Sequence, residues 1–179
     1  DNSWFLDAYA LHFCSVSLGN FPMRKAHDKA IRYAKESGSI ISFDPNVRLP
    51  LFSDHEYLKN VIHEYIQYAD ILKISDEEVE FIFGNNDIEE NLEYLFNKGV
   101  KLVVYTSGKN GAKAYTTNSV AQSDGIEVKA IDTTGAGDGF IGCLLYQLAK
   151  DNVSLKQLNS LTKDKLKKYL DTSNKFCSI

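Results

Sequence analysis

Residues 132–138 read DTTGAGD, small residues between two carboxylates, and they precede a long apolar stretch. Gly135, Ala136 and Gly137 would form the first turn of the helix that this stretch predicts. The free N–H groups and the dipole of a helix start attract anions, so the segment predicts a phosphate site. Asp138 would repel an anion there unless it acts as a base or binds a cation. The plainer alternative is that Asp138 caps the helix.

Three other segments are dense in polar residues, each directly after a short apolar run: residues 44–48 (DPNVR), 75–78 (SDEE) and 106–111 (TSGKNG). If the apolar runs are strands of a parallel sheet, these segments meet at its carboxyl edge, where such sheets bind ligands. Phosphoryl transfer needs positioned cations, backbone N–H groups and a carboxylate, and the four segments together offer all three.

The spacing of apolar residues predicts the elements that would position these segments. Strands are expected at residues 8–17, 40–43, 71–74, 102–105, 112–117 and 126–130, and helices at 24–37, 54–69, 76–83, 88–97, 138–150 and 163–175. Asp54 is placed to cap the second of these helices. The alternation of strand and helix as far as residue 105 predicts an α/β fold with a mostly parallel central sheet covered by helices.

The composition argues against several classes of partner and location. Lys and Arg number 20 against 24 Asp and Glu, a net charge of -4 with dispersed basic residues, which removes the electrostatic basis for a nucleic-acid partner. No apolar run approaches the roughly 20 residues that cross a bilayer, so no membrane partner is expected. Cys14, Cys143 and Cys177 are widely spaced, which predicts free thiols and a cytoplasmic location.

A second glycine pattern, G-x-G-x-x-G at Gly137, Gly139 and Gly142, matches the fingerprint of dinucleotide-binding proteins. That fingerprint opens the first strand–helix unit and is followed by a strand ending in an acidic residue. Here the residues that follow have a helical pattern, so we set aside a dinucleotide-dependent oxidoreductase.

The DTTGAGD segment resembles the D-T-x-G-A-G-D signature of the ribokinase-like (PfkB) carbohydrate kinases, and the other three segments follow the order of that family's active-site loops. The resemblance spans residues 10–179, and residues 43–52 (FDPNVRLPLF) make it most similar to fructokinases, with 2-keto-3-deoxygluconate kinases next. One departure is Ser75, which stands where the family's N-x-x-E motif has asparagine.

The resemblance implies a three-layer ribokinase-like fold in which residues 1–179 form the C-terminal part of a single kinase domain, truncated at both ends. The N-terminal half, with its lid, would be absent. The implied activity is that of an ATP-dependent sugar kinase, with fructokinase as first choice. A kinase for another sugar or a nucleoside and a non-catalytic nucleotide-binding fragment remain as alternatives. The implied cofactors are Mg²⁺ and K⁺ with ATP as co-substrate, and the intact protein would form a homodimer.

The resemblance also assigns roles to residues. Asp138 would be the catalytic base, and the N–H groups of Gly135, Ala136 and Gly137 would stabilise the transferred phosphoryl group. ATP would contact Lys73, Ser75, Thr106, Gly108, Gly111, Gly135 and Gly137; the sugar would contact Asn46, Arg48 and Asp138; Glu78 would hold Mg²⁺ through water, and Asp132 and Thr134 would bind K⁺. Two plainer alternatives are a solvated helix face for Glu78 and a simple hairpin turn for residues 106–111.

Overall fold

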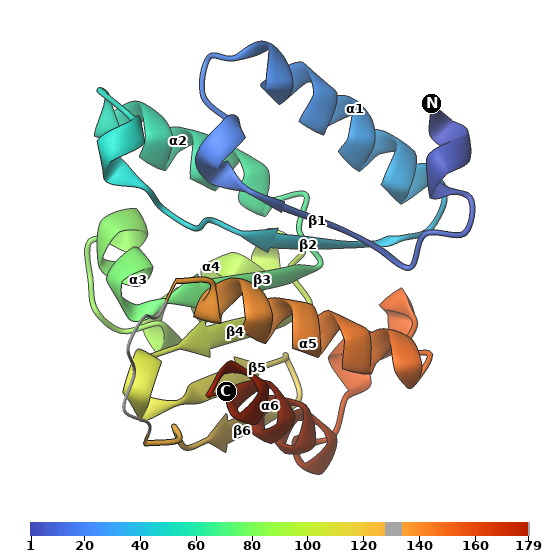
Figure 1. Ribbon diagram of the computed structural model, residues 1–179, viewed down its shortest axis with the longest axis vertical. Helices are drawn as coiled ribbons and strands as arrows, with labels where there is room; N and C mark the ends of the chain where they lie inside the picture. The colour runs from blue at the N-terminus through green and yellow to red at the C-terminus, as the bar shows by residue number, and fades with distance from the viewer. Residues whose placement is uncertain (128–133, 179) are drawn as a thin grey trace.

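A six-stranded sheet forms the centre of the computed structural model, which describes residues 1–127 and 134–178 (Figure 1). In spatial order its strands are β1 (Ala10–Cys14), β2 (Ile40–Asp44), β3 (Ile71–Ser75), β4 (Leu102–Thr106), β5 (Ala112–Tyr115) and β6 (Val120–Ser123). The first four strands are parallel, and β5 and β6 are antiparallel additions at one edge. This arrangement confirms the predicted α/β fold with a mostly parallel sheet.

Helices cover both faces of the sheet, as expected for three layers. The helices are α1 (Pro22–Glu36), α2 (His55–Ile66), α3 (Asp76–Phe83), α4 (Leu92–Asn97), α5 (Ala136–Lys150) and α6 (Lys163–Cys177), with short 3-10 turns at Asn2–Phe5, Ser15–Ser17, Leu49–Leu51, Glu89–Asn91, Gly108–Asn110 and Leu155–Ser160. The first four pack on one face, and α5 and α6 lie together on the other, in front of the sheet in Figure 1. None of the helices in the described part of the chain is long and apolar enough to cross a membrane.

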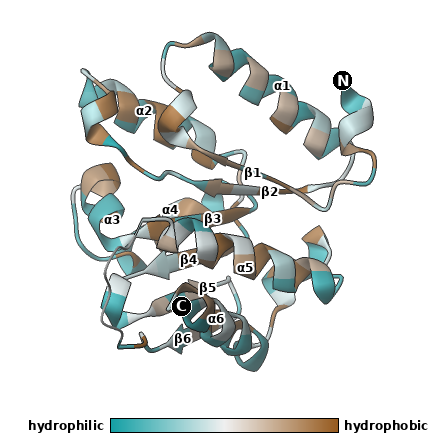
Figure 2. Cartoon of the chain, viewed as in Figure 1, coloured by the Kyte–Doolittle hydropathy of each residue, from teal (hydrophilic) through white to brown (hydrophobic). Residues whose placement is uncertain are grey.

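Each face of the sheet carries its own apolar core. Figure 2 shows apolar residues on the strands and on the helix surfaces that face them. Phe43, Leu72 and Ile74 belong to the core under the first four helices, whereas Ile71 and Val104 belong to the core under α5 and α6. Alternate residues of the parallel strands therefore supply the two cores, as the pleat of a strand requires.

The predicted strand at residues 126–130 is wrong where the structure describes it, because residues 126 and 127 lie outside the sheet. On the side of β5 away from β4, its antiparallel partner is β6, a strand of alternately exposed and buried residues that is not among the strands predicted from the sequence. After β6 the chain passes close to the loop between β4 and β5, since a Cβ at Gly125 would lie 1.9 Å from the carbonyl oxygen of Lys109. Residues 128–130 lie outside the described residues.

Two charged residues interrupt the apolar face beneath α5. On this face, Ile40 gives way to Asp44 at the carboxyl end of β2, and Ile71 gives way to Lys73 in the middle of β3. The parallel register places Phe43 beside Leu72, so the next residues along, Asp44 and Lys73, lie together under the start of α5.

Candidate active site

The start of α5 presents unpaired backbone donors. Gly135 is the N-cap, with a φ of 81°, a left-handed conformation that glycine adopts without steric cost. The N–H of Gly139 is bonded to the carbonyl of Gly135 at 2.8 Å, which leaves the N–H groups of Ala136, Gly137 and Asp138 without acceptors inside the helix. Since the cap position belongs to Gly135, the alternative that Asp138 caps this helix is wrong.

An open pocket of about 360 Å³ lies against this helix start, and we call it the α5 pocket. Its lining residues are Asn46, Arg48, Lys73, Thr134, Gly135, Gly137 and Asp138. All seven were predicted site residues, and they come from the loop after β2, from β3 and from the start of α5. The pocket therefore holds two cations and one carboxylate beside free backbone donors, a combination suited to binding an anion and moving a proton.

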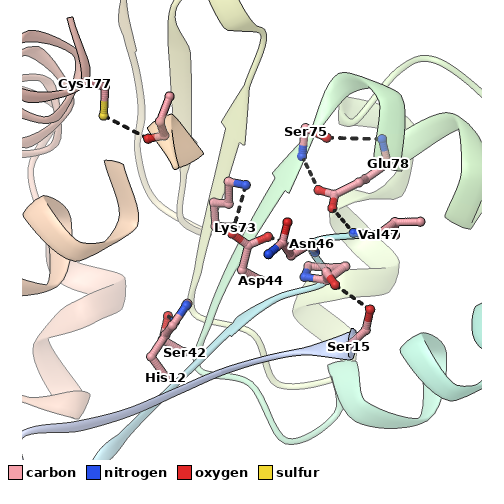
Figure 3. Close-up of polar contacts among 12 residues, drawn as sticks. His12, Ser15, Ser42, Asp44, Asn46, Val47, Lys73, Ser75, Glu78 and Cys177 are labelled. Atoms are coloured by element: carbon pink, nitrogen blue, oxygen red, sulfur yellow. Dashed lines mark hydrogen bonds and ion pairs between the residues drawn. The ribbon is translucent and has the colours of Figure 1, made fainter. Parts of the chain in front are cut away.

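Lys73 reaches the α5 pocket from a buried position. Its Nζ lies 2.9 Å from Oδ2 of Asp44, and both residues are almost fully buried, Lys73 at 6% and Asp44 at 1% exposure (Figure 3). Burial raises the pKa of Asp44 to about 6, the nearby charge of Glu78 adds to the rise, and Lys73 opposes it. The other carboxylate oxygen of Asp44 accepts the N–H of Asn46 at 3.1 Å. Asn46 has a φ of 45°.

Glu78 ties the loop after β2 to the start of α3. Its Oε1 accepts the N–H of Val47 and its Oε2 accepts the N–H of Ser75, both at 2.8 Å (Figure 3). The Ser75 hydroxyl in turn accepts the N–H of Glu78, which completes a capping box. Glu78 is buried at 7% exposure, so the alternative of a solvated helix face is wrong.

A second open pocket, of about 600 Å³, lies beyond the same helix start, and we call it the hairpin pocket. Its lining residues are Gly108, Lys109, Asn110, Gly125, Ile126, Glu127, Ala136, Asn174, Cys177 and Ser178. Ala136 faces this pocket and Gly137 faces the α5 pocket, so the two pockets meet at the first turn of α5.

The loop between β4 and β5 is a hairpin, as the simpler alternative held, and it also forms a wall of the hairpin pocket. The N–H of Ser107 is bonded to the carbonyl of Gly111 at 2.9 Å. Gly108 lines the pocket, whereas Thr106 and Gly111 are not among its lining residues. A Cβ at Gly111 would lie 2.1 Å from the carbonyl oxygen of Ser123, so that glycine permits close packing of the hairpin.

Sequence reasoning missed two residues of α6. The Nδ2 of Asn174 donates to the Ser123 hydroxyl at 2.9 Å and to the carbonyl of Asp124 at 3.3 Å, which fixes the chain beside the hairpin pocket. The Cys177 thiol donates to the carbonyl of Ala136 at 3.1 Å, and burial raises its pKa to about 11. Nothing in the sequence connects α6 with segments about 40 to 50 residues upstream, and only the tertiary fold brings them together.

The predicted cation sites are described only in part. Asp132 lies outside the described residues, whereas Thr134 lines the α5 pocket. Among residues 1–127 and 134–178, no three His, Cys, Asp or Glu side chains gather into a metal-binding cluster.

Comparison with known proteins identifies the family. Residues 1–161 match the family model described as pfkB family carbohydrate kinase. The chain belongs to this family. It is 41% identical over 157 residues to the probable fructokinase-2 of Arabidopsis thaliana, covering 87% of this chain and 48% of that protein. It is also 41% identical over 150 residues to fructokinase-2 of Solanum lycopersicum, covering 83% of this chain and 46% of that protein.

Solved structures of PfkB proteins share the fold. The Vibrio cholerae O395 fructokinase bound to fructose, ADP and a calcium ion superimposes with a TM-score of 0.81 at 37% identity, covering 94% of this chain and 53% of that one. The ATP-bound fructokinase of Xylella fastidiosa gives 0.91 at 23% identity, covering 99% and 56%, which bears on the fold alone. These matches confirm the ribokinase-like fold and the PfkB resemblance. The chain spans about half the length of the curated relatives named here.

Proposed function

We propose that this PfkB protein is an ATP-dependent sugar kinase that transfers the γ-phosphoryl group of ATP to a hydroxyl of fructose. The observation that carries the proposal is the α5 pocket, where Arg48, Lys73 and the free N–H groups of the first helical turn surround Asp138. Such donors and cations stabilise the charge that spreads over the transferring phosphoryl group.

The two pockets suggest how the nucleotide lies. Its base and ribose would occupy the hairpin pocket beside Gly108 and Asn174, and its phosphates would cross the first turn of α5 into the α5 pocket. Ser75, Thr106 and Gly111 remain proposed nucleotide contacts from the family resemblance. The ADP named in the Vibrio cholerae structure supports this use of the site.

The acceptor sugar would bind in the α5 pocket, near Asn46 and Arg48, with the reacting hydroxyl beside Asp138. The hydroxyl oxygen attacks the γ-phosphorus, the bond from that phosphorus to the bridging oxygen breaks, and ADP leaves. The hydroxyl proton passes to the Asp138 carboxylate, which is exposed in the pocket and therefore able to accept it. Gly135, Ala136 and Gly137 direct backbone N–H groups at the phosphoryl oxygens.

The side chains of this site fit a Mg²⁺ ion whose ligands are mainly phosphate oxygens and water molecules. Glu78 already accepts two backbone N–H groups, so we propose that its remaining lone pairs orient a water of the hydrated ion. When bound, Mg²⁺ neutralises phosphate charge that Arg48 and Lys73 only partly offset. We propose Asp132 and Thr134 as K⁺ ligands on the family resemblance.

An ADP-release assay with fructose, ribose, adenosine and 2-keto-3-deoxygluconate tests the proposal. Fructose should give the highest turnover, with fructose phosphate detected by mass spectrometry. Faster turnover of another acceptor would reassign the substrate. ATP binding without ADP release from any acceptor would favour a non-catalytic nucleotide-binding protein.

Location and assembly are further proposals. Cys14, Cys143 and Cys177 are free, which supports the cytoplasmic location that we propose. We also propose a homodimer, which light scattering of the purified protein would test.

A further inference from the structure

The ion pair between Asp44 and Lys73 differs from the others in this molecule. The side chains of Asp44 and Lys73 are only 2% and 8% exposed. Among the ion pairs of the described residues, no other has both partners so deeply buried. Exposed pairs form at little cost, whereas a buried pair must overcome the loss of hydration of both charges.

A contribution to folding stability does not explain why a carboxylate is buried at position 44. Its pKa is raised to about 6 even though a lysine ammonium lies 2.9 Å away, because burial disfavours the charged form more than Lys73 favours it. A buried ion pair whose carboxylate titrates high contributes little to folding, and replacing both partners by uncharged residues of similar shape often leaves a protein as stable.

The position of the pair beside the α5 pocket indicates a different role. Lys73 lines the α5 pocket and Asp44 does not, so the carboxylate lies behind the cation. A Cβ at Gly137 would lie only 3.2 Å from the Nζ of Lys73, which places that charge directly beneath the first turn of α5. Without a counter-ion, the ammonium group would be repelled by the positive end of the helix dipole.

We propose that Asp44 is a positioning residue for phosphoryl transfer, which holds the Nζ of Lys73 against the first turn of α5. The cation is then in place before the phosphoryl group begins to move, and no reorganisation is required in the transition state. This inference rests on the proposed kinase function. Asp44 itself touches neither nucleotide nor sugar and acts through Lys73.

The substitution Asp44→Asn isolates this role. Asparagine has nearly the same shape, and its carbonyl oxygen can still accept the N–H of Asn46 that Asp44 holds at 3.1 Å. The change therefore removes the attraction for Lys73 while keeping the loop bond.

Asp70 provides a matched control at the opposite end of the sheet. It pairs with Lys101 at 2.8 Å and accepts the N–H of Ile41 at 2.9 Å, so it also joins a lysine to a backbone donor from a mostly buried position. It precedes β3, whereas the α5 pocket lies beyond the carboxyl ends of the strands. Asp70→Asn should leave turnover and ATP affinity unchanged.

The test combines turnover, ATP affinity by calorimetry and the denaturation midpoint at pH 7. Asp44→Asn should lower kcat by about 10- to 100-fold, as expected when a catalytic charge is misplaced by up to about 1 Å. ATP affinity should not fall, because one negative charge near the phosphates has been removed, whereas the midpoint should fall because Lys73 is left buried without its partner. Unchanged kcat in the folded variant, or a loss of ATP affinity that accounts for the lost turnover, would overturn the proposal.

A double substitution covers the case in which Asp44→Asn alone does not fold. Lys73→Met and the pair Lys73→Met with Asp44→Asn should have equal kcat, since Asp44 has no cation left to position. A further loss in the double variant would show that Asp44 acts by another route and would overturn the proposal. If the unmodified protein neither binds ATP nor phosphorylates a sugar, the proposed kinase function itself fails, an outcome distinct from equal kcat in a working enzyme.

Discussion

Glu78 on α3 accepts the backbone N–H of Val47 at 2.8 Å, and so joins the loop after β2 to the helix after β3. The same carboxylate accepts the N–H of Ser75, which makes one side chain responsible for the positions of two neighbouring loops. Arg48, which lines the α5 pocket, directly follows the residue that Glu78 holds. The position of this cation therefore depends on a carboxylate from another element.

We expect Glu78→Gln to destabilise the protein by about 1 to 3 kcal/mol, because glutamine offers one acceptor oxygen where two N–H groups need one each. Chemical denaturation measures this loss. Glu80→Gln removes the same charge from an exposed position of the same helix and should have little effect. Equal effects of the two substitutions would show that the bridge to Val47 contributes nothing.

Asp44 should make part of the stability depend on pH. Its pKa rises from 3.8 to about 6 on folding, through burial and the nearby Glu78 and against Lys73, so the folded state binds this proton more tightly than the unfolded state. The stability that the protein gains by protonating Asp44 is therefore full below about pH 4 and is lost as pH rises through about 6. Measured against Asp44→Asn, the free energy of unfolding should fall over this window by on the order of 3 kcal/mol. Urea titrations of both proteins from pH 4 to pH 7 test this, and parallel curves would contradict it.

Gly137 and Gly142 form a matched pair on α5. A Cβ at Gly137 would lie 3.2 Å from the Nζ of Lys73, whereas one at Gly142 would have no atom within 4 Å. We expect Gly137→Ala to lower kcat by roughly tenfold by pushing Lys73 aside. Gly142→Ala should raise stability by about 0.5 to 1 kcal/mol with activity unchanged, because alanine favours a helix. Steady-state kinetics with thermal unfolding tests both, and equal activity of the two variants would contradict the close packing at Gly137.

Asp138→Asn should slow the chemical step by about 10²- to 10⁴-fold while ATP binds as well as before or more tightly, because the amide cannot accept the hydroxyl proton and no longer repels phosphate. Single-turnover kinetics at saturating fructose and ATP measure the step. Asp164→Asn changes an exposed acid in the first turn of α6 and should be silent. A comparable rate in the two variants would remove Asp138 as the base.

Much of the framework follows from local sequence. The predicted cap of α2 is present, with the Asp54 carboxylate accepting the N–H of Tyr57 at 2.8 Å. The DTTGAGD segment placed the start of α5 correctly because small residues and a helix-length apolar pattern are local signals. The four parallel strands were recognised from their continuous apolar runs, which are typical of strands buried on both faces. β6 was missed because its four residues alternate in burial and carry no such run.

The tertiary structure decided how the segments combine. The sequence suggested roles for Lys73 and Glu78, but their partners, Asp44 and Val47, lie 29 and 31 residues away in the chain. Asn174 contacts Ser123 across 51 residues. Such contacts depend on how parallel strands and their helices pack, and no local propensity encodes them. Residue types and spacing therefore determined the chemistry available to this protein, whereas packing decided which groups meet, because burial and charge pairing exist only once the sheet has assembled.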